Sequence, residues 1–199
     1  MDTNDINQLF SKGQLRNLII IVGVLLLFFV LKPWAQVGAG QRGVVLNFGA
    51  VQDIVLEEGI HFRTPIMQDI VLIDVKIQKV VTDAKSSSSD LQDVDMAVAL
   101  NYNIIPENAN IVYQTIGTDY KSRIIDPAIQ EVMKAVSARY TAEELITKRP
   151  VVSSEMREAL KERLLEANIS VVAFLLLTLV FLKPLLMQLR QSKPQSKMR

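Results

Sequence analysis

The sequence predicts an α+β fold, in which the strands come first along the chain and the helices follow. Two segments, residues 73–77 and 94–102, alternate apolar and polar side chains with the two-residue period of a half-buried strand. After Asp126 and again after Pro150, apolar side chains recur at helical spacing. A chain of 199 residues is long enough for one such domain and one membrane segment.

The first predicted element is a membrane helix. Leu18 to Leu31 is an unbroken apolar run of fourteen residues with a single glycine, and as a helix it would span about 21 Å. Including seven flanking residues, with Arg16 and Lys32 snorkelling, gives roughly 31 Å, enough to cross the hydrocarbon core. The sequence therefore predicts an N-terminal flank over residues 1–17 and a single-pass transmembrane anchor over residues 18–35.

A cleaved signal peptide is the alternative for the same segment. The run length suits the apolar region of a signal peptide, and Val37-Gly38-Ala39 has the small-residue spacing of a cleavage site. Cleavage there would release an exported soluble binding domain. The local residues leave both interpretations open, and the orientation of an anchor also stays open because basic residues flank the run on both sides.

Strands and turns are predicted next. Val44 to Phe48 is a strand that ends in a turn at Gly49, and Glu58-Gly59 marks another turn. The serine-rich stretch from Ser86 to Asp90 is expected to be a flexible polar loop between the two alternating segments. Three glycines just after the apolar run are interpreted as a flexible exit from the bilayer: Gly38, Gly40 and Gly43.

Three helices are predicted in the second half. Asp126-Pro127 suggests an N-cap followed by proline in the first turn, and Thr141 with Glu144 is a capping-box signature. The apolar face of the first helix comprises Ile129, Val132, Met133 and Val136. A four-residue stripe in the last helix comprises Val152, Met156, Leu160 and Leu164.

Residues that could carry chemistry are scarce, so we predict that the chain is not an enzyme and has no catalytic, cofactor-binding or metal site. The chain has no cysteine and a single histidine, His61, which is interpreted as a packing or hydrogen-bonding residue. The serines at 86–89 lack a nucleophile-elbow context. Two acidic pairs are interpreted as solvated charge: Asp93 with Asp95, and Glu143 with Glu144.

Charge is distributed unevenly along the chain. Residues 169–199 contain five basic residues and no acid, which leaves a net charge of −4 on the part before them. An acidic body offers no electrostatic footprint for nucleic acid, so nucleic acid is not expected as a partner.

The stretch from Gln41 to Phe174 resembles the prohibitin family, within the stomatin, prohibitin and flotillin group whose common domain is called band 7 or SPFH. Several segments in order carry the resemblance: Gln41-Arg42-Gly43-Val44-Val45 with Phe48-Gly49, Glu58-Gly59-Ile60-His61-Phe62-Arg63 with Pro65, Asp90-Leu91-Gln92, Pro127-Ala128-Ile129 with Glu131, Lys134-Ala135, and Tyr140 to Ile146 with Arg149. The resemblance places the SPFH domain over residues 36–174 and favours the anchor over the signal peptide.

The resemblance also implies a function. It implies a non-catalytic scaffold in a bacterial or mitochondrial inner membrane, with membrane lipids, self or paralogous subunits in a ring, and an AAA-type membrane protease as partners. Family members carry a long coiled-coil helix after the domain, and this chain lacks that helix. The chain is therefore expected to assemble poorly by itself.

Residues 175–199 are predicted to be a frame-shifted tail, because both acids and the family resemblance end just after Phe174. With codons CTG ACT TTA GTT TTT CTG AAG CCT for Leu177 to Pro184, reading from the last base of Leu177 gives Asp-Phe-Ser-Phe-Ser-Glu-Ala. That sequence resembles the family at this point, and permitted codons up to Arg199 continue it as an Ala-, Glu- and Gln-rich helix. The alternative is a second membrane helix over 171–182 and 185–189, in a two-span protein.

Overall fold

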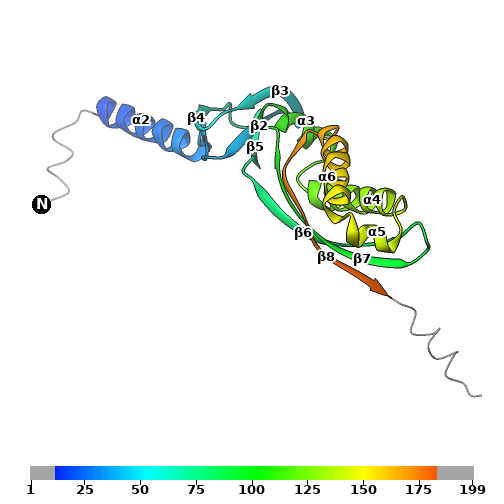
Figure 1. Cartoon of the computed structure of the whole chain (residues 1–199). Helices are drawn as coiled ribbons and strands as arrows, with labels where there is room; N and C mark the ends of the chain where they lie inside the picture. The colour runs from blue at the N-terminus through cyan, green and yellow to red at the C-terminus, as the bar shows by residue number, and fades with distance from the viewer. Residues whose placement is uncertain (1–11, 183–199) are drawn as a thin grey trace, which may run out of the picture. The chain divides into compact units, whose positions relative to one another are not determined.

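The computed structural model describes residues 12–182, which belong to two compact units (Figure 1). Unit 1 comprises Met1–Ile73, and unit 2 comprises Asp74–Arg199.

Unit 1 consists of one helix and five strands. Helix α2 (Lys12–Leu31) is followed by β1 (Trp34–Val37), β2 (Gln41–Asn47), β3 (Ala50–Leu56), β4 (Gly59–Phe62) and β5 (Gln68–Asp74). The strands form a two-stranded sheet, β1-β4, and a three-stranded sheet in the order β3-β2-β5. The predicted strand and turn around Val44 and Gly49 are confirmed, since β2 leads through Phe48 and Gly49 into β3.

The predicted transmembrane helix over residues 18–35 is wrong. Among residues 12–182, no helix combines the length and the apolar character that crossing a membrane requires. The prediction assumed a helix that continued to Ala35, whereas α2 ends at Leu31 and β1 begins at Trp34. The apolar part of α2 is therefore only the fourteen residues from Leu18 on, about 21 Å of helix against a hydrocarbon core of about 30 Å.

The glycines after α2 lie in ordered structure, so the predicted flexible exit is also wrong. Gly38 accepts a hydrogen bond from the backbone N–H of Gln41 at 3.1 Å. Gly43 is part of β2, and a Cβ atom on it would lie 3.0 to 3.1 Å from side-chain atoms of Ile70, Leu56 and Val37. Close packing of two strands and a neighbouring sheet therefore requires a residue without a side chain here.

The position of β1 argues against cleavage near Ala39. Val37, at the end of β1, is 2% exposed and pairs with Gly59 of β4. Removal of everything before Gly40 would delete β1 and leave β4 without its only strand partner in this sheet. The exported-domain alternative therefore does not fit the fold.

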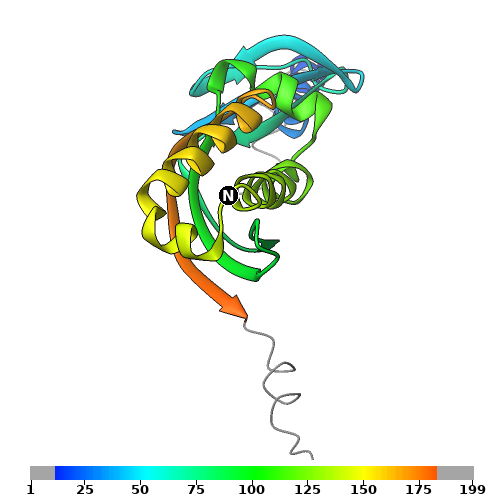
Figure 2. The same ribbon diagram turned by 45° about the vertical axis from the view of Figure 1, so that its right-hand side comes forward.

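Unit 2 is a three-stranded antiparallel sheet with helices on one face. The strands β6 (Gln78–Ser87), β7 (Asp93–Ile104) and β8 (Ile169–Leu182) lie in that order. The connection from β7 to β8 holds α3 (Ala109–Thr115), α4 (Asp126–Ser137), α5 (Ala142–Thr147) and α6 (Arg149–Leu165), with short turns at Pro106–Asn108 and Lys121–Ile125. Figure 2 shows α4 and α6 lying along the inner side of the curved sheet.

The core of unit 2 lies between the sheet and these helices. The predicted apolar faces of both helices are confirmed, because Ile129, Met133, Val152, Met156, Leu160 and Leu164 are all 0% exposed. They meet the inward side chains of the sheet, which include Val94, Met96, Val98 and Leu100. Each fully buried side chain of this size contributes about 1.5 to 3 kcal/mol, so this layer dominates the stability of unit 2.

Two predicted strands have different outcomes. The strand at 94–102 is confirmed as the centre of β7. The segment at 73–77 is not one strand, since β5 ends at Asp74 and β6 begins at Gln78. The carboxylate of Asp74 accepts a hydrogen bond from the N–H of Lys76 at 2.9 Å, an Asx-type turn that interrupts the strand despite its alternating pattern.

Strand β8 crosses the predicted domain boundary at residue 174. It pairs with β7 from Ile169 opposite Ile104 to Leu182 opposite Asp93. The alternative of a second membrane helix is therefore wrong over 171–182, and its remainder at 185–189 lies outside the described residues. The strand had no predicted counterpart because its sequence is apolar on both faces.

Replacement of Gly43 by alanine is expected to destabilise unit 1 by about 1 to 3 kcal/mol, because the added methyl group enters a packed site. Urea denaturation followed by circular dichroism would measure the effect. Gly23→Ala is the matched control, since nothing lies within 4 Å of a Cβ at that helical position. Equal stability of the two variants would contradict the packing argument.

The register of β8 gives the frame-shift prediction a structural form. Leu179 lies opposite the buried Met96, whereas Thr178 and Val180 lie opposite Ala97 and Asp95 on the other face. In the other frame, phenylalanine would replace Leu179, and aspartate and serine would replace Thr178 and Val180. That frame has the apolar-inward, polar-outward alternation that a one-sided sheet favours.

Resequencing of the locus checks this prediction. We expect one additional base near codons 175–177 and an open frame that continues into a Glu-, Ala- and Gln-rich helix. A stop codon soon after this point in the other frame would reject it.

Candidate interaction surfaces

The hairpin between β6 and β7 is a rigid structure, contrary to the predicted flexible loop at 86–90. Strand β6 continues to Ser87, and Ser88 is 3% exposed. The Ser88 hydroxyl donates to the Asp90 carboxylate at 2.6 Å, and the amide of Gln92 donates to the same carboxylate at 3.0 Å. The serine run therefore builds the hairpin.

Asp90 also joins the hairpin to α5. Its carboxylate accepts the backbone N–H of Ala142 at 3.0 Å, and the carbonyl of Tyr140 accepts the N–H of Ser89 at 2.9 Å. The hydrogen bonds from Ser88, Ala142 and Gln92 outweigh partial desolvation and hold the pKa of Asp90 below its ordinary value.

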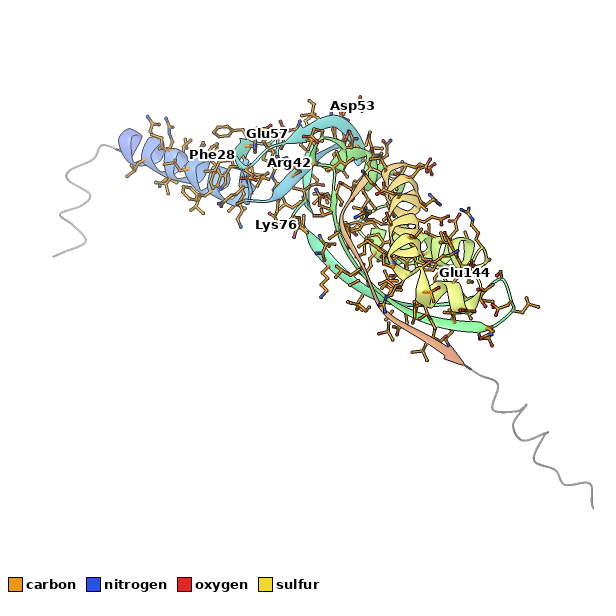
Figure 3. The ribbon with its side chains drawn as sticks, in the orientation of Figure 1. Phe28, Arg42, Asp53, Glu57, Lys76 and Glu144 are labelled. Carbon is orange, nitrogen blue, oxygen red and sulfur yellow. The ribbon has the colours of Figure 1, made fainter. Side chains whose placement is uncertain are left out.

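The predicted capping box at the start of α5 is confirmed. The Thr141 hydroxyl accepts the N–H of Glu144, and the Glu144 carboxylate accepts the N–H of Thr141, both at 3.2 Å. Glu144, labelled in Figure 3, also pairs with Lys148 at 2.8 Å, and this contact lowers the pKa of Glu144 and raises that of Lys148. The other predicted cap is wrong, because Asp126 accepts a hydrogen bond from Thr82 at 2.8 Å and makes no side-chain cap.

Arg149 supports a bulge in the last strand. Its guanidinium donates to the carbonyls of Leu176 and Leu177, at 2.7 and 3.1 Å. The pairing of β7 with β8 shifts at this point, so the extra residue leaves carbonyls that need a donor outside the regular ladder. Gln130 of α4 similarly donates to the carbonyl of Asp83 in β6 at 2.7 Å.

A groove of about 630 Å³ runs between α4 and α6. Its floor is apolar, formed by residues such as Ala135, Ala159 and Leu165, and its rim is charged. Arg163 crosses from α6 to Glu131 of α4 at 3.2 Å, and Arg139 pairs with Glu155 across the same two helices. These ion pairs join the helices, so the groove is part of their packing seam.

Unit 1 presents a different kind of surface, because many of its large apolar side chains are exposed. From Leu18 to Leu31, every large apolar side chain that the structure describes is between 36% and 69% exposed. Several residues of the strands and turns are also exposed: Phe48, Ile54, Ile60, Phe62, Ile66, Met67 and Leu72. Figure 3 shows these side chains projecting from α2, where Phe28 is labelled.

The remaining sequence-selected residues have structural surroundings. His61 lies with its Nε2 atom 2.8 Å from the carbonyl of Glu57. Glu58 accepts the N–H of Gly40 at 2.9 Å and pairs with Arg42 at 3.6 Å, which joins two turns of unit 1. Asp93 and Asp95 lie on the outer face of β7, opposite Ser87 and Lys85 of β6. Within residues 12–182, no three potential metal ligands come together.

These features define an α+β protein with a helix-covered sheet, a small β-rich unit and surfaces suited to contact with partners. The sequence profile of the SPFH domain / Band 7 family matches residues 35–192. The chain belongs to this family. Because the curated relatives that it matches include prohibitins, the predicted resemblance to prohibitins is confirmed.

Three relatives illustrate the similarity. Prohibitin-7, mitochondrial, of Arabidopsis thaliana is 32% identical over 151 residues, which cover 75% of this chain and 54% of the relative. Prohibitin 1 of Mus musculus is 35% identical over 129 residues, covering 64% of this chain and 47% of the relative. Mitochondrial prohibitin complex protein 1 of Caenorhabditis elegans has the same identity and coverage. The chain spans about half the length of these curated relatives.

Acid is expected to loosen the hairpin clamp. The folded-state pKa of Asp90 is depressed, so its contribution to stability is present above the unfolded pKa and is lost as the pH falls through the folded pKa, below about 4. Chemical denaturation between pH 6 and pH 3 should show a smaller loss of stability for Asp90→Asn than for the unaltered chain. Asp53→Asn, in a strand of unit 1, is the control and should follow the unaltered chain. Parallel pH profiles for all three proteins would contradict the assigned role of Asp90.

Proposed function

We propose that the chain is a non-catalytic, membrane-associated scaffold of the prohibitin type. The observation that carries this proposal is the exposure of α2, whose apolar side chains from Leu18 to Leu31 have little cover from the described chain. A helix that is apolar on every side is stable only in apolar surroundings, such as a large protein interior or lipid. Lipid fits best here, because Arg16 and Lys32 flank the apolar part and can extend toward head groups.

Assembly with copies of itself or with paralogous chains is the second part of the proposal. The name of the worm relative refers to a prohibitin complex, and we extend that property to this chain. A scaffold needs a rigid body that presents the same surfaces in each copy. Unit 2 fits this requirement, because its hairpin, helices and strand bulge are held by specific hydrogen bonds from Asp90, Gln130 and Arg149.

Regulation of an AAA-type membrane protease is the finest level of the proposal, and it rests on the resemblance to prohibitins. No enzymatic role is proposed. The titratable residues that the motifs contain take part in caps, turns and ion pairs, as Asp90, Glu144 and Glu58 illustrate.

Vesicle flotation tests membrane association. The double substitution Leu25→Asp with Leu26→Asp should reduce vesicle binding at least roughly a hundredfold, because each charge in an apolar lipid layer costs about 2.5 to 3.5 kcal/mol. Leu91→Asp is the matched control in unit 2, where Leu91 is 88% exposed, and its binding should be unchanged. Flotation of the double variant together with the unaltered chain would contradict membrane association through α2. Cross-linking on the same vesicles tests assembly, and monomers alone would contradict that part.

A further inference from the structure

A second apolar surface of unit 1 lies on β4 and its partner strand. Ile60 and Phe62 are two residues apart in β4, so they share one face of the strand, and they are 70% and 85% exposed. Trp34 of β1 is the cross-strand neighbour of Phe62. Large apolar side chains are therefore exposed side by side on a two-stranded sheet.

Two turns next to this sheet expose apolar residues in strained conformations. Phe48 has φ 49° and is 74% exposed, and Ile66 has φ 75° and is 91% exposed. Positive φ is uncommon for residues other than glycine and is a true outlier for a β-branched residue such as Ile66. The backbone N–H of Phe48 donates to the carbonyl of Met67 at 2.8 Å, so the two turns are joined. Strain of this kind persists where the surrounding structure fixes it, and it is often associated with function.

The same turns connect to the end of α2. The N–H of Arg63 donates to the carbonyl of Pro33 at 2.9 Å, and its Nε donates to the carbonyl of Lys32 at 3.4 Å. The ring of Trp34 lies 6.2 Å from that of Phe28 and 5.9 Å from that of Phe29, measured between centroids. The apolar side chains of α2 therefore continue, through Trp34, into the exposed apolar residues of the β strands and turns.

We propose that this surface, which we call the apolar tip, enters the outer part of a lipid bilayer beside α2. The apolar tip comprises Trp34, Phe48, Ile60, Phe62, Ile66 and Met67. The inference rests on the proposed membrane association and adds a second lipid contact to it. Lipid is the occupant that the observations favour, because the tip is continuous with α2 and because a tryptophan and the basic residues Lys32 and Arg63 lie where the two surfaces meet, as is typical of a membrane–water interface.

The tip has a mechanical consequence for a scaffold. A single helix can rotate and tilt in lipid, whereas a helix with a second, laterally displaced contact holds the attached β strands in one orientation to the surface. Joined turns suit this role, because the hydrogen bond between Phe48 and Met67 makes both apolar side chains part of one rigid element.

Fluorescence labelling of the full chain tests the proposal. The chain has no cysteine, so a single introduced cysteine is the only site for a thiol-reactive, polarity-sensitive dye. Four variants are needed: Phe48→Cys and Ile66→Cys in the tip, Leu25→Cys in α2, and Leu91→Cys as an equally exposed control in unit 2. Each is labelled and mixed with vesicles of neutral and anionic phospholipid that contain, or lack, quencher groups on the acyl chains.

We expect the dye at positions 48 and 66 to shift its emission to shorter wavelength on vesicles and to lose intensity with the quencher lipids, and the dye at position 91 to do neither. A lipid response at position 25 without one at 48 and 66 would overturn the apolar tip and leave the proposed function intact. The absence of a response at position 25 as well would overturn the proposed function.

A second measurement does not depend on the dye. Phe48→Ser with Ile66→Ser should weaken vesicle binding by roughly tenfold or more, because two large apolar side chains no longer leave water. The turns should tolerate serine, since both side chains are exposed in the free protein. Unchanged binding by a variant with a native circular dichroism spectrum would contradict the proposal.

Discussion

Burial of one face of the β6-β7-β8 sheet beneath α4 and α6 is the constraint on which unit 2 depends. The connection from β7 to β8 contains all of the helices of this unit, so the last strand reaches its place only after α4 and α6 cover the sheet. The buried layer joins residues that are far apart in sequence, such as Leu100, Met133 and Leu160, each 0% exposed. The polar groups at the edges of this layer must then find partners within a fixed geometry, and a small number of side chains supply them.

Those side chains explain why polar residues are prominent in the recognisable segments of the sequence. Asp90 satisfies the first turn of α5, Arg149 satisfies carbonyls at the bulge of β8, and Gln130 satisfies a carbonyl of β6. Each of them connects a helix to the sheet. Loss of such a partner leaves a poorly solvated backbone group at a cost of about 1 to 3 kcal/mol, comparable to loss of an apolar side chain from the core. Motif residues of this kind maintain shape, which is the property that a contact surface needs.

The sequence predicted the elements whose local pattern and tertiary environment agree. The capping box at Thr141 and the stripe that ends at Leu164 are local features, and both are present in the structure. It failed where a local hydrogen bond or a distant partner decides the outcome. The carboxylate of Asp74 divides a stretch with ideal strand alternation, and the hairpin at Ser88 is rigid because of Tyr140 and Ala142, some fifty residues away. β8 was missed because an apolar pattern on both faces has no strand period. The apolar length of α2 was overestimated because Pro33 and the pairing of Trp34 with Phe62 end the helix early.

The two units of the chain distribute their apolar residues in opposite ways, and this difference suggests a division of work. In unit 2 the large apolar side chains of the helices mostly face a shared interior, and the strained Leu91 is an isolated exposed residue at a hairpin turn. In unit 1 the strands are short, two small sheets replace one large one, and only Val37, Val44 and Ile73 are buried apolar residues among those described. A unit with so few buried side chains gains little stability from its own interior. Its exposed apolar residues gain most when another apolar phase covers them, so the same residues that make unit 1 a weak isolated domain suit it for a membrane surface, while unit 2 holds its shape without one.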